Sequence, residues 1–189
     1  MLSVVIATRD SERALLPTLA ALVAGAAAGV VREVIIADAG SRDASAAIAD
    51  GAGCRVLISS DPHGARLKAA AEAARGPWLL FLRPGTVPDA TWIDEARRFI
   101  EDAELRGADN AAAFRAASAT FRPALVEALA LLRAALGARP NAGQGLLIAK
   151  ALYLDLGGHR DVDEPEREFI RRLGRRRTVL LRSGATTPG

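Results

Sequence analysis

The chain has 189 residues, of which half are hydrophobic and a quarter charged, with a formal net charge of +3 and a pI near 9.7. This composition excludes a disordered chain and fits one folded domain. Of the 25 basic residues, 23 are arginines in an alanine-rich chain, and such basicity alone is weak evidence for nucleic acid. No nucleic-acid partner is therefore expected. The single cysteine, Cys54, excludes an internal disulfide and a cysteine-based zinc cluster, so a reducing compartment, the cytoplasm, is expected.

The first predicted strand is the β-branched run from Leu2 to Ala7, which enters a polar turn without the features of a signal peptide. A helix is predicted from near Pro17, because proline is favoured in a first helical turn. The uncharged stretch from Ala14 to Val31 has 18 residues, the lower limit for a membrane span. Its bulky residues share one stripe, so a core-facing helix is predicted instead. That stripe contains Leu15, Leu19 and Leu22, with Leu16 and Val23 beside it.

Strands and helices alternate through the rest of the first half. The predicted strands are 33–37, 55–59 and 78–82, and the helices between them are 44–51 and 66–75. This alternation is typical of an α/β fold with a mostly parallel central sheet and flanking helices. Ligands bind beyond the carboxyl ends of strands in such sheets, so the loops after Ala7, Ala37 and Leu82 are expected to share one crevice.

The second half gives weaker patterns. A helix is predicted from beyond Pro88 to about Asp102, followed by a strand 111–121, a helix 123–136 and a short strand 178–181. A charged segment, 160–177, precedes the last strand. No internal repeat and no linker divides the chain, so a single domain is expected.

The strand-end loops limit the possible chemistry. The loop after the first strand has no glycine, which excludes the dinucleotide-binding and P-loop fingerprints. Asp38 follows the second strand, where a carboxylate can accept hydrogen bonds from ribose hydroxyls or a base. An ordinary capped turn, with Gly40 providing backbone freedom and Asp43 capping the next helix, explains the same residues. A haloacid dehalogenase-type hydrolase would need a second aspartate at position 40, which is glycine.

Four segments resemble family 2 glycosyltransferases in order and spacing. They are 4–12, 33–43, 64–66 and 76–82, and the segments 141–150, 156–158 and 169–173 are similar to the acceptor-side segments of small soluble members. The resemblance implies a GT-A fold in one domain, 1–189. It also implies a nucleotide-sugar-binding half over 1–100, an acceptor-side half over 101–182 and a tail over 183–189.

The same resemblance implies transfer of a sugar from a nucleotide diphosphate sugar to an unidentified acceptor, with inversion at the anomeric carbon. Thr8, Asp10 and Asp38 would then hold the nucleoside, and Arg66 would lie near the diphosphate. These residue types suit the ligand, because directed acceptors fit a base and ribose whereas a guanidinium fits a diphosphate.

One motif of the family is missing. Its Asp-x-Asp type motif holds a divalent metal after the strand that corresponds to 78–82, whereas this chain has Arg83-Pro84-Gly85. Mg²⁺ or Mn²⁺, the metals of the family, are not expected here because carboxylates normally hold them. Either Arg83 replaces the metal by stabilising the departing diphosphate, or it is a solvated loop residue. In the second case the chain is a catalytically degenerate relative that binds a nucleotide or a protein partner.

The acceptor side leaves a similar choice. Glu166 falls at the position of the family's catalytic base, with Pro165 in place of the preceding acid, and Gly143 replaces a further acid. The alternative is that Glu166 and its acidic neighbours complement the dipole of a solvated helix.

A basic cluster ends this segment, on Arg171, Arg172, Arg175, Arg176 and Arg177. It could contact anionic lipid head groups or a phosphorylated acceptor, or be a solvated helix end. His63 and His159 are expected to be loop residues with no role in a metal site.

Overall fold

The computed structural model describes residues 1–107, 109–116 and 144–187. Its centre is an eight-stranded sheet in the order β3-β2-β1-β4-β7-β6-β8-β5. In the first half, β1 (Leu2–Thr8) pairs with β2 (Val31–Asp38) and β4 (Trp78–Leu82), and β2 pairs with β3 (Arg55–Ile58), always in parallel. Every residue of β1 and β4 is buried, as expected of parallel strands covered on both faces.

The second half makes the sheet mixed. Antiparallel pairing joins β4 to β7 (Leu146–Ala149) and β7 to β6 (Ala111–Ala116). Strand β8 (Thr178–Thr186) then runs parallel to β6, and β5 (Val87–Pro88) pairs antiparallel with β8 at the edge. The predicted parallel sheet therefore describes the β3-β2-β1-β4 half, which is the half that carries the strand-end loops.

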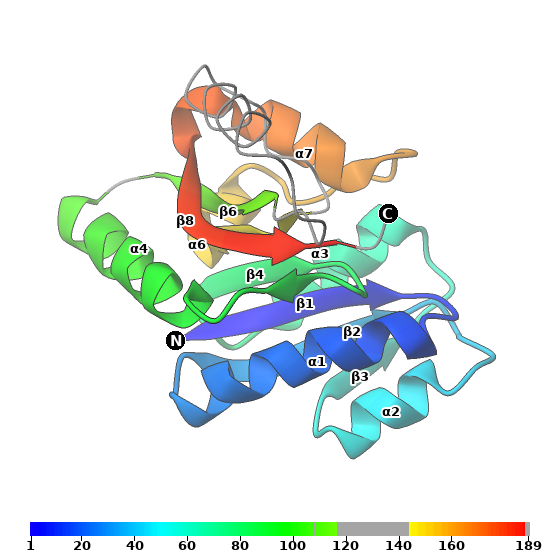
Figure 1. Ribbon diagram of the computed structural model, residues 1–189. Helices are drawn as coiled ribbons and strands as arrows, with labels where there is room; N and C mark the ends of the chain where they lie inside the picture. The colour runs from blue at the N-terminus through cyan, green and yellow to red at the C-terminus, as the bar shows by residue number, and fades with distance from the viewer. Residues whose placement is uncertain (108, 117–143, 188–189) are drawn as a thin grey trace, which may run out of the picture.

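Helices cover the two faces of the sheet (Figure 1). On one face lie α1 (Glu12–Ala27), α2 (Ser45–Gly51) and α4 (Trp92–Arg106); on the other lie α3 (His63–Ala73), α6 (Lys150–Asp155) and α7 (Pro165–Leu173). Alternate residues of β1 face the two layers, so Val4 and Ile6 pack with the first set while Val5 and Ala7 pack with the second. A short 3-10 helix, η2 (Arg175–Arg177), leads into β8.

Helix α1 begins at Glu12, so the start predicted near Pro17 is wrong. The backbone N–H of Glu12 donates to Oδ2 of Asp43 over 3.0 Å, which caps the helix with a residue that the local sequence does not contain. Leu16 and Val23 lie on the exposed side of the helix rather than beside the buried stripe. Within the described ranges, no helix has the length and apolar character needed to cross a membrane.

Other boundaries also differ from the sequence pattern. Helix α3 begins at His63 rather than Arg66, and β8 continues to Thr186 instead of ending at Leu181. Strand β6 is described as far as Ala116. The helix predicted over 123–136 and the substitution at Gly143 lie outside the described residues.

Candidate functional site

The loops after β1 and β2 are joined by a set of hydrogen bonds. The N–H of Asp10 donates to Ser41 Oγ (2.9 Å), and the N–H of Arg42 donates to Asp10 Oδ1 (2.7 Å). Two carboxylates each cap the other loop's helix: Asp43 accepts from the N–H of Glu12, and Glu12 accepts from the N–H of Ala44. The two loops thus form one rim at the carboxyl edge of the sheet.

Thr8 and Asp38 lie at the floor of this rim and bind each other. Thr8 Oγ1 donates to Asp38 Oδ1 over 2.6 Å, and Ser41 donates to both carboxylate oxygens through its hydroxyl and its N–H. Asp38 is only 1% exposed, and burial raises its pKa, but the bonds from Ser41, Thr8 and Gly40 outweigh burial and leave the pKa below its ordinary value. The aspartate predicted to hold a nucleoside is therefore an ionised residue that already organises the loop.

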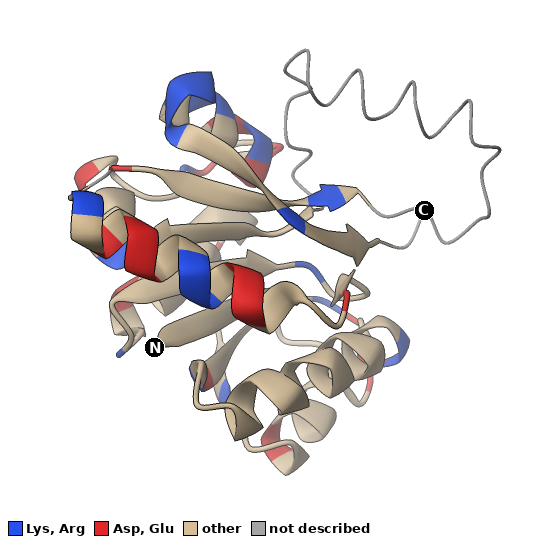
Figure 2. Cartoon of the chain, turned by 60° about the vertical axis from the view of Figure 1, so that its left-hand side comes forward, with Lys and Arg blue, Asp and Glu red and all other residues tan. Residues whose placement is uncertain are grey.

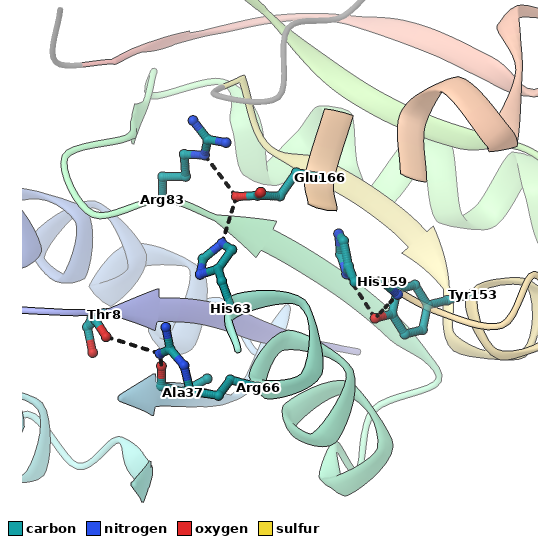
Figure 3. A network of polar contacts seen from close by, with 8 residues as sticks. All are labelled: Thr8, Ala37, His63, Arg66, Arg83, Tyr153, His159 and Glu166. Carbon is teal, nitrogen blue, oxygen red and sulfur yellow. Dashed lines mark hydrogen bonds and ion pairs between the residues drawn. The ribbon is translucent and has the colours of Figure 1, made fainter. Parts of the chain in front are cut away.

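Arg66 supports both strand ends from α3. Its Nη1 donates to the carbonyls of Thr8 (3.2 Å) and Ala37 (2.5 Å), as Figure 3 shows. Its Nε donates to the carbonyl of Asp61. The guanidinium is buried, and this burial, with the nearby charge of Arg9, lowers its pKa. These contacts place a cation directly beneath the loops after β1 and β2.

Arg83, His63 and Glu166 meet from three different elements (Figure 3). Arg83 follows β4, His63 opens α3, and Glu166 lies in the first turn of α7. Glu166 Oε1 accepts from Arg83 Nε at 3.0 Å and contacts His63 Nε2 at 3.2 Å. The side chains of Arg83 and His63 are 49% and 40% exposed, whereas that of Glu166 is 13% exposed. The sequence predicted Arg83 and Glu166 for one site, and the structure brings them into direct contact.

The two donors make Glu166 a strong acid. Burial alone would raise its pKa, but the hydrogen bonds from His63 and Arg83 and their charges lower the pKa to about 2. Glu166 is therefore ionised at neutral pH. While both donors are in place it is a weak proton acceptor.

An open pocket of about 440 Å³ lies over this contact. Its volume falls within the range of small-molecule sites. Its lining combines the end of β1, the start of α1, the loop after β4 and the start of α7, through Ala7, Ser11, Ala14, His63, Arg83, Pro84, Asp163, Glu164, Pro165 and Glu166. A second cavity of about 20 Å³, room for about one water molecule, lies against His63, Arg83, Glu166 and His159.

An aromatic cluster beneath α7 fixes the position of this helix. Tyr153 Oη accepts from the N–H of His159 (3.0 Å) and shares a proton with His159 Nδ1 (2.9 Å), and both rings contact Phe169 of α7. Burial lowers the pKa of His159 to about 4, so this histidine is neutral at neutral pH. It occupies a loop as the sequence predicted, but as a buried residue that supports the site.

Arg172, expected to contact lipid or a phosphorylated acceptor with its basic neighbours, is not part of an exposed basic surface. Its Nη1 and Nη2 donate to the carbonyls of Leu156 and Gly158, it pairs with Glu168, and its guanidinium lies over the ring of Phe169. The other members of the basic cluster are exposed, at Arg171, Arg175, Arg176 and Arg177. Figure 2 shows the basic residues of η2 gathered beside α7, whereas α4 carries bands of both signs.

Within the described residues, no three His, Cys, Asp or Glu side chains are grouped so that they could hold a metal ion. His63 and Glu166 are adjacent ligand types, but Arg83 binds the same carboxylate oxygen. A guanidinium on that oxygen disfavours a second cation there. The arrangement can bind an anion through Arg83 and can accept a proton at the His63–Glu166 pair.

Sequence reasoning missed His63 as a member of the site. A signal was present: His63 follows β3 at the same edge of the sheet as the loops after β1, β2 and β4. Glu166, its partner, lies 103 positions away.

Comparisons with known proteins point to one family. A model described as Glycosyl transferase family 2 matches residues 3–112. No curated protein sequence matches the chain. The fold is similar to that of TarS from S. aureus, with a TM-score of 0.71 at 15% identity over 98% of this chain and 60% of that one. It is also similar to glucosyl-3-phosphoglycerate synthase from Mycobacterium tuberculosis in complex with UDP, with a TM-score of 0.69 at 19% identity over 95% and 69% of the two chains.

Both similar proteins have the GT-A fold, so the expected fold class is confirmed. This chain spans about 60% of the length of the TarS chain. TarS has also been solved in complex with UDP-GlcNAc, with a TM-score of 0.69 at 16% identity over all of this chain and 59% of that one.

Proposed function

Because the chain belongs to glycosyl transferase family 2, we propose that it transfers a sugar from a nucleotide diphosphate sugar to an acceptor hydroxyl. The observation that carries this proposal is the pocket at the strand ends, which has the exposed cation Arg83 after β4 and the carboxylate Glu166 on α7. A diphosphate requires a cation such as Arg83. Deprotonation of an acceptor hydroxyl requires a carboxylate such as Glu166.

The nucleoside is proposed to lie over the joined loops after β1 and β2. Thr8 and Asp38 shape the floor of these loops, Asp10 lies on their rim, and Arg66 holds both strand ends beneath them. UDP is the first nucleotide to test, because TarS and the mycobacterial synthase were both solved with UDP. In this proposal Asp38 and Arg66 act mainly by fixing the loops, since protein groups already use their hydrogen bonds.

Arg83 is proposed to take the part that a metal plays in the family. Its permanent charge would stabilise the departing diphosphate, and its half-exposed side chain lines the pocket. On the acceptor side, Glu166 provides the carboxylate that takes part in deprotonating the acceptor hydroxyl. A single displacement at the anomeric carbon, with the hydroxyl attacking opposite the diphosphate, would invert that centre.

A catalytically degenerate module that binds a nucleotide or a protein is the second candidate. The observation that favours it is the ion pair itself, because Arg83 and Glu166 occupy each other and leave Glu166 a weak base. Under this alternative the pair is a structural clasp between the loop after β4 and α7.

Binding and turnover of a panel of UDP-, GDP- and dTDP-sugars, with and without Mn²⁺, separate the candidates. We expect a donor to bind and release its nucleoside diphosphate without metal. Arg83→Ala should weaken binding about 10-fold to 100-fold, as expected for a lost charged hydrogen bond. Arg106→Ala is the matched control, because Arg106 forms an exposed ion pair on α4. Binding without turnover would favour the degenerate module, and no binding by any donor would refute both nucleotide-based candidates.

We also propose that the four exposed arginines near η2 contact anionic head groups at a membrane surface. Each is expected to contribute on the order of 1 kcal/mol near such a surface. Sedimentation with phosphatidylserine vesicles, compared with neutral phosphatidylcholine vesicles, tests the contact. Equal binding to both vesicle types would contradict it.

A further inference from the structure

The contact between His63 and Glu166 determines which nitrogen of His63 carries the proton. Glu166 is an ionised carboxylate and accepts hydrogen bonds but donates none. Its Oε1 lies 3.2 Å from Nε2 of His63, so Nε2 must be the N–H of the neutral ring. The other nitrogen, Nδ1, then carries a lone pair.

His63 is also placed to meet a ligand. Its side chain is 40% exposed and lines both the 440 Å³ pocket and the small cavity behind it. In Figure 3 the ring directs one nitrogen at Glu166 and the other away from it. A base held in one tautomer by a carboxylate, with a lone pair left on its other nitrogen, is the arrangement that activates hydroxyl nucleophiles in unrelated enzymes.

We propose that Nδ1 of His63 takes the proton of the acceptor hydroxyl, and that Glu166 is the positioning carboxylate which fixes the tautomer of His63 and stabilises its charged form. The inference rests on the proposed transfer reaction. The acceptor O–H bond breaks and its proton moves to Nδ1, while the oxygen electron pair forms the bond to the anomeric carbon. The bond from that carbon to the diphosphate breaks, and its electron pair leaves with the nucleoside diphosphate.

The strong acidity of Glu166 supports this assignment. A carboxylate with a pKa of about 2 holds a proton poorly near neutral pH, whereas histidine is the side chain whose ordinary titration lies closest to it. Arg83 need not leave Glu166 for His63 to act, because the two donors approach Oε1 from different elements.

Charges of both signs surround His63. Glu166 faces it from α7 and Arg83 from the loop after β4, while Asp163 and Glu164 line the same pocket. His159 is close enough for the two histidines to affect one another electrostatically.

The tautomer can be measured without any substrate. The chain has two histidines, so long-range ¹H–¹⁵N spectra resolve both rings, and His63→Gln assigns them. We expect neutral His63 to be the Nε2–H form in the wild type and a mixture of tautomers in Glu166→Gln. A wild-type ring protonated at Nδ1 would overturn the inference, whether or not any donor is turned over.

Kinetics tests the proton transfer itself. With water as the acceptor, release of UDP from whichever UDP-sugar binds is followed from pH 5 to 9. His63→Gln keeps a donor toward Glu166 and should slow release about 10²-fold to 10⁴-fold and flatten the pH profile, with donor affinity unchanged. Glu166→Gln should slow release but keep a pH-dependent rate.

The activities of the two variants separate the proposed role of His63 from the proposed transferase function. Full activity in His63→Gln with complete loss in Glu166→Gln would overturn the role of His63 and leave the transferase proposal intact. Absence of donor binding in the wild type would instead refute the transferase proposal, and the spectra would still decide the tautomer. Unfolding curves of both variants confirm that each is folded.

Discussion

Nε of Arg83 donates to Oε1 of Glu166 over 3.0 Å, although the two residues are 83 positions apart in the chain. The contact joins the loop after β4 to α7, and so links the proposed diphosphate cation to the proposed acceptor-side carboxylate. A bound diphosphate would compete with Glu166 for the guanidinium. The pair therefore couples the two halves of the proposed site.

Glu166→Gln is expected to remove an acid-sensitive contribution to stability. The folded-state pKa of Glu166, about 2, lies below the ordinary glutamate value, so its contribution is present above pH 4.5 and is lost as the pH falls towards 2. It amounts to at most about 3 kcal/mol. Denaturant unfolding between pH 2 and 5 should give a shallower loss of stability for Glu166→Gln than for the wild type, and Glu101→Gln, at an exposed position, should follow the wild type.

His159 should make the protein less stable in a different pH window. Its folded-state pKa of about 4 lies below the ordinary value, so the unfolded chain binds the proton first as the pH falls from about 6.5 to 4. The free energy of unfolding should fall by up to about 3 kcal/mol across that window. In His159→Gln this dependence should be largely absent. An equal dependence in both proteins would show that His159 is not the group responsible.

Gly64→Ala should separate α3 from the segment before α7. A Cβ at Gly64 would lie 2.0 Å from the carbonyl oxygen of Arg160, which requires the backbone to move. We expect a loss of about 1–3 kcal/mol in unfolding free energy and a weakened His63–Glu166 contact. Gly51→Ala is the matched control: a Cβ there meets open space in α2, so stability should stay the same or rise slightly. Equal effects of the two substitutions would contradict the close approach.

Arg66→Met should destabilise the carboxyl edge of the sheet. The substitution removes the donors to the carbonyls of Thr8 and Ala37 and leaves both acceptors buried. A loss of about 2–3 kcal/mol is expected in denaturant unfolding. Arg55→Met is the comparison, because Arg55 donates a single exposed bond to the carbonyl of Ala73 and should change stability by less than about 0.5 kcal/mol. A similar small loss for Arg66→Met would mean that water replaces its bonds.

The parallel half of the fold could be predicted because its signals are local. The runs at β1, β2 and β4 are continuous and apolar, and the predicted strand 78–82 coincides with β4. The start of α1 could not be predicted, since its cap comes from Asp43 on another loop. The length of β8 depends on its pairing with β6 and β5, which the sequence pattern does not contain.

The site could be predicted only in part, because its contacts also join residues that are far apart in the chain. Arg83 and Glu166 were identified by their place in a family pattern, but their mutual contact depends on how α7 lies over β4. Arg172 looked like part of a basic run, although helical periodicity turns it inward, onto two backbone carbonyls and the ring of Phe169. The role of His63 left no local signal in the sequence, because its partner Glu166 lies 103 positions away.

The reciprocal caps between Glu12 and Asp43 have a further consequence for ligand binding. Since each carboxylate holds the first turn of the other loop's helix, neither loop can reorganise without releasing a capping bond in its neighbour. The rim is therefore held in place before the proposed nucleoside binds, and little conformational entropy remains to be lost on binding. Affinity at this edge should then depend on fit, and replacing either carboxylate should release one capping bond.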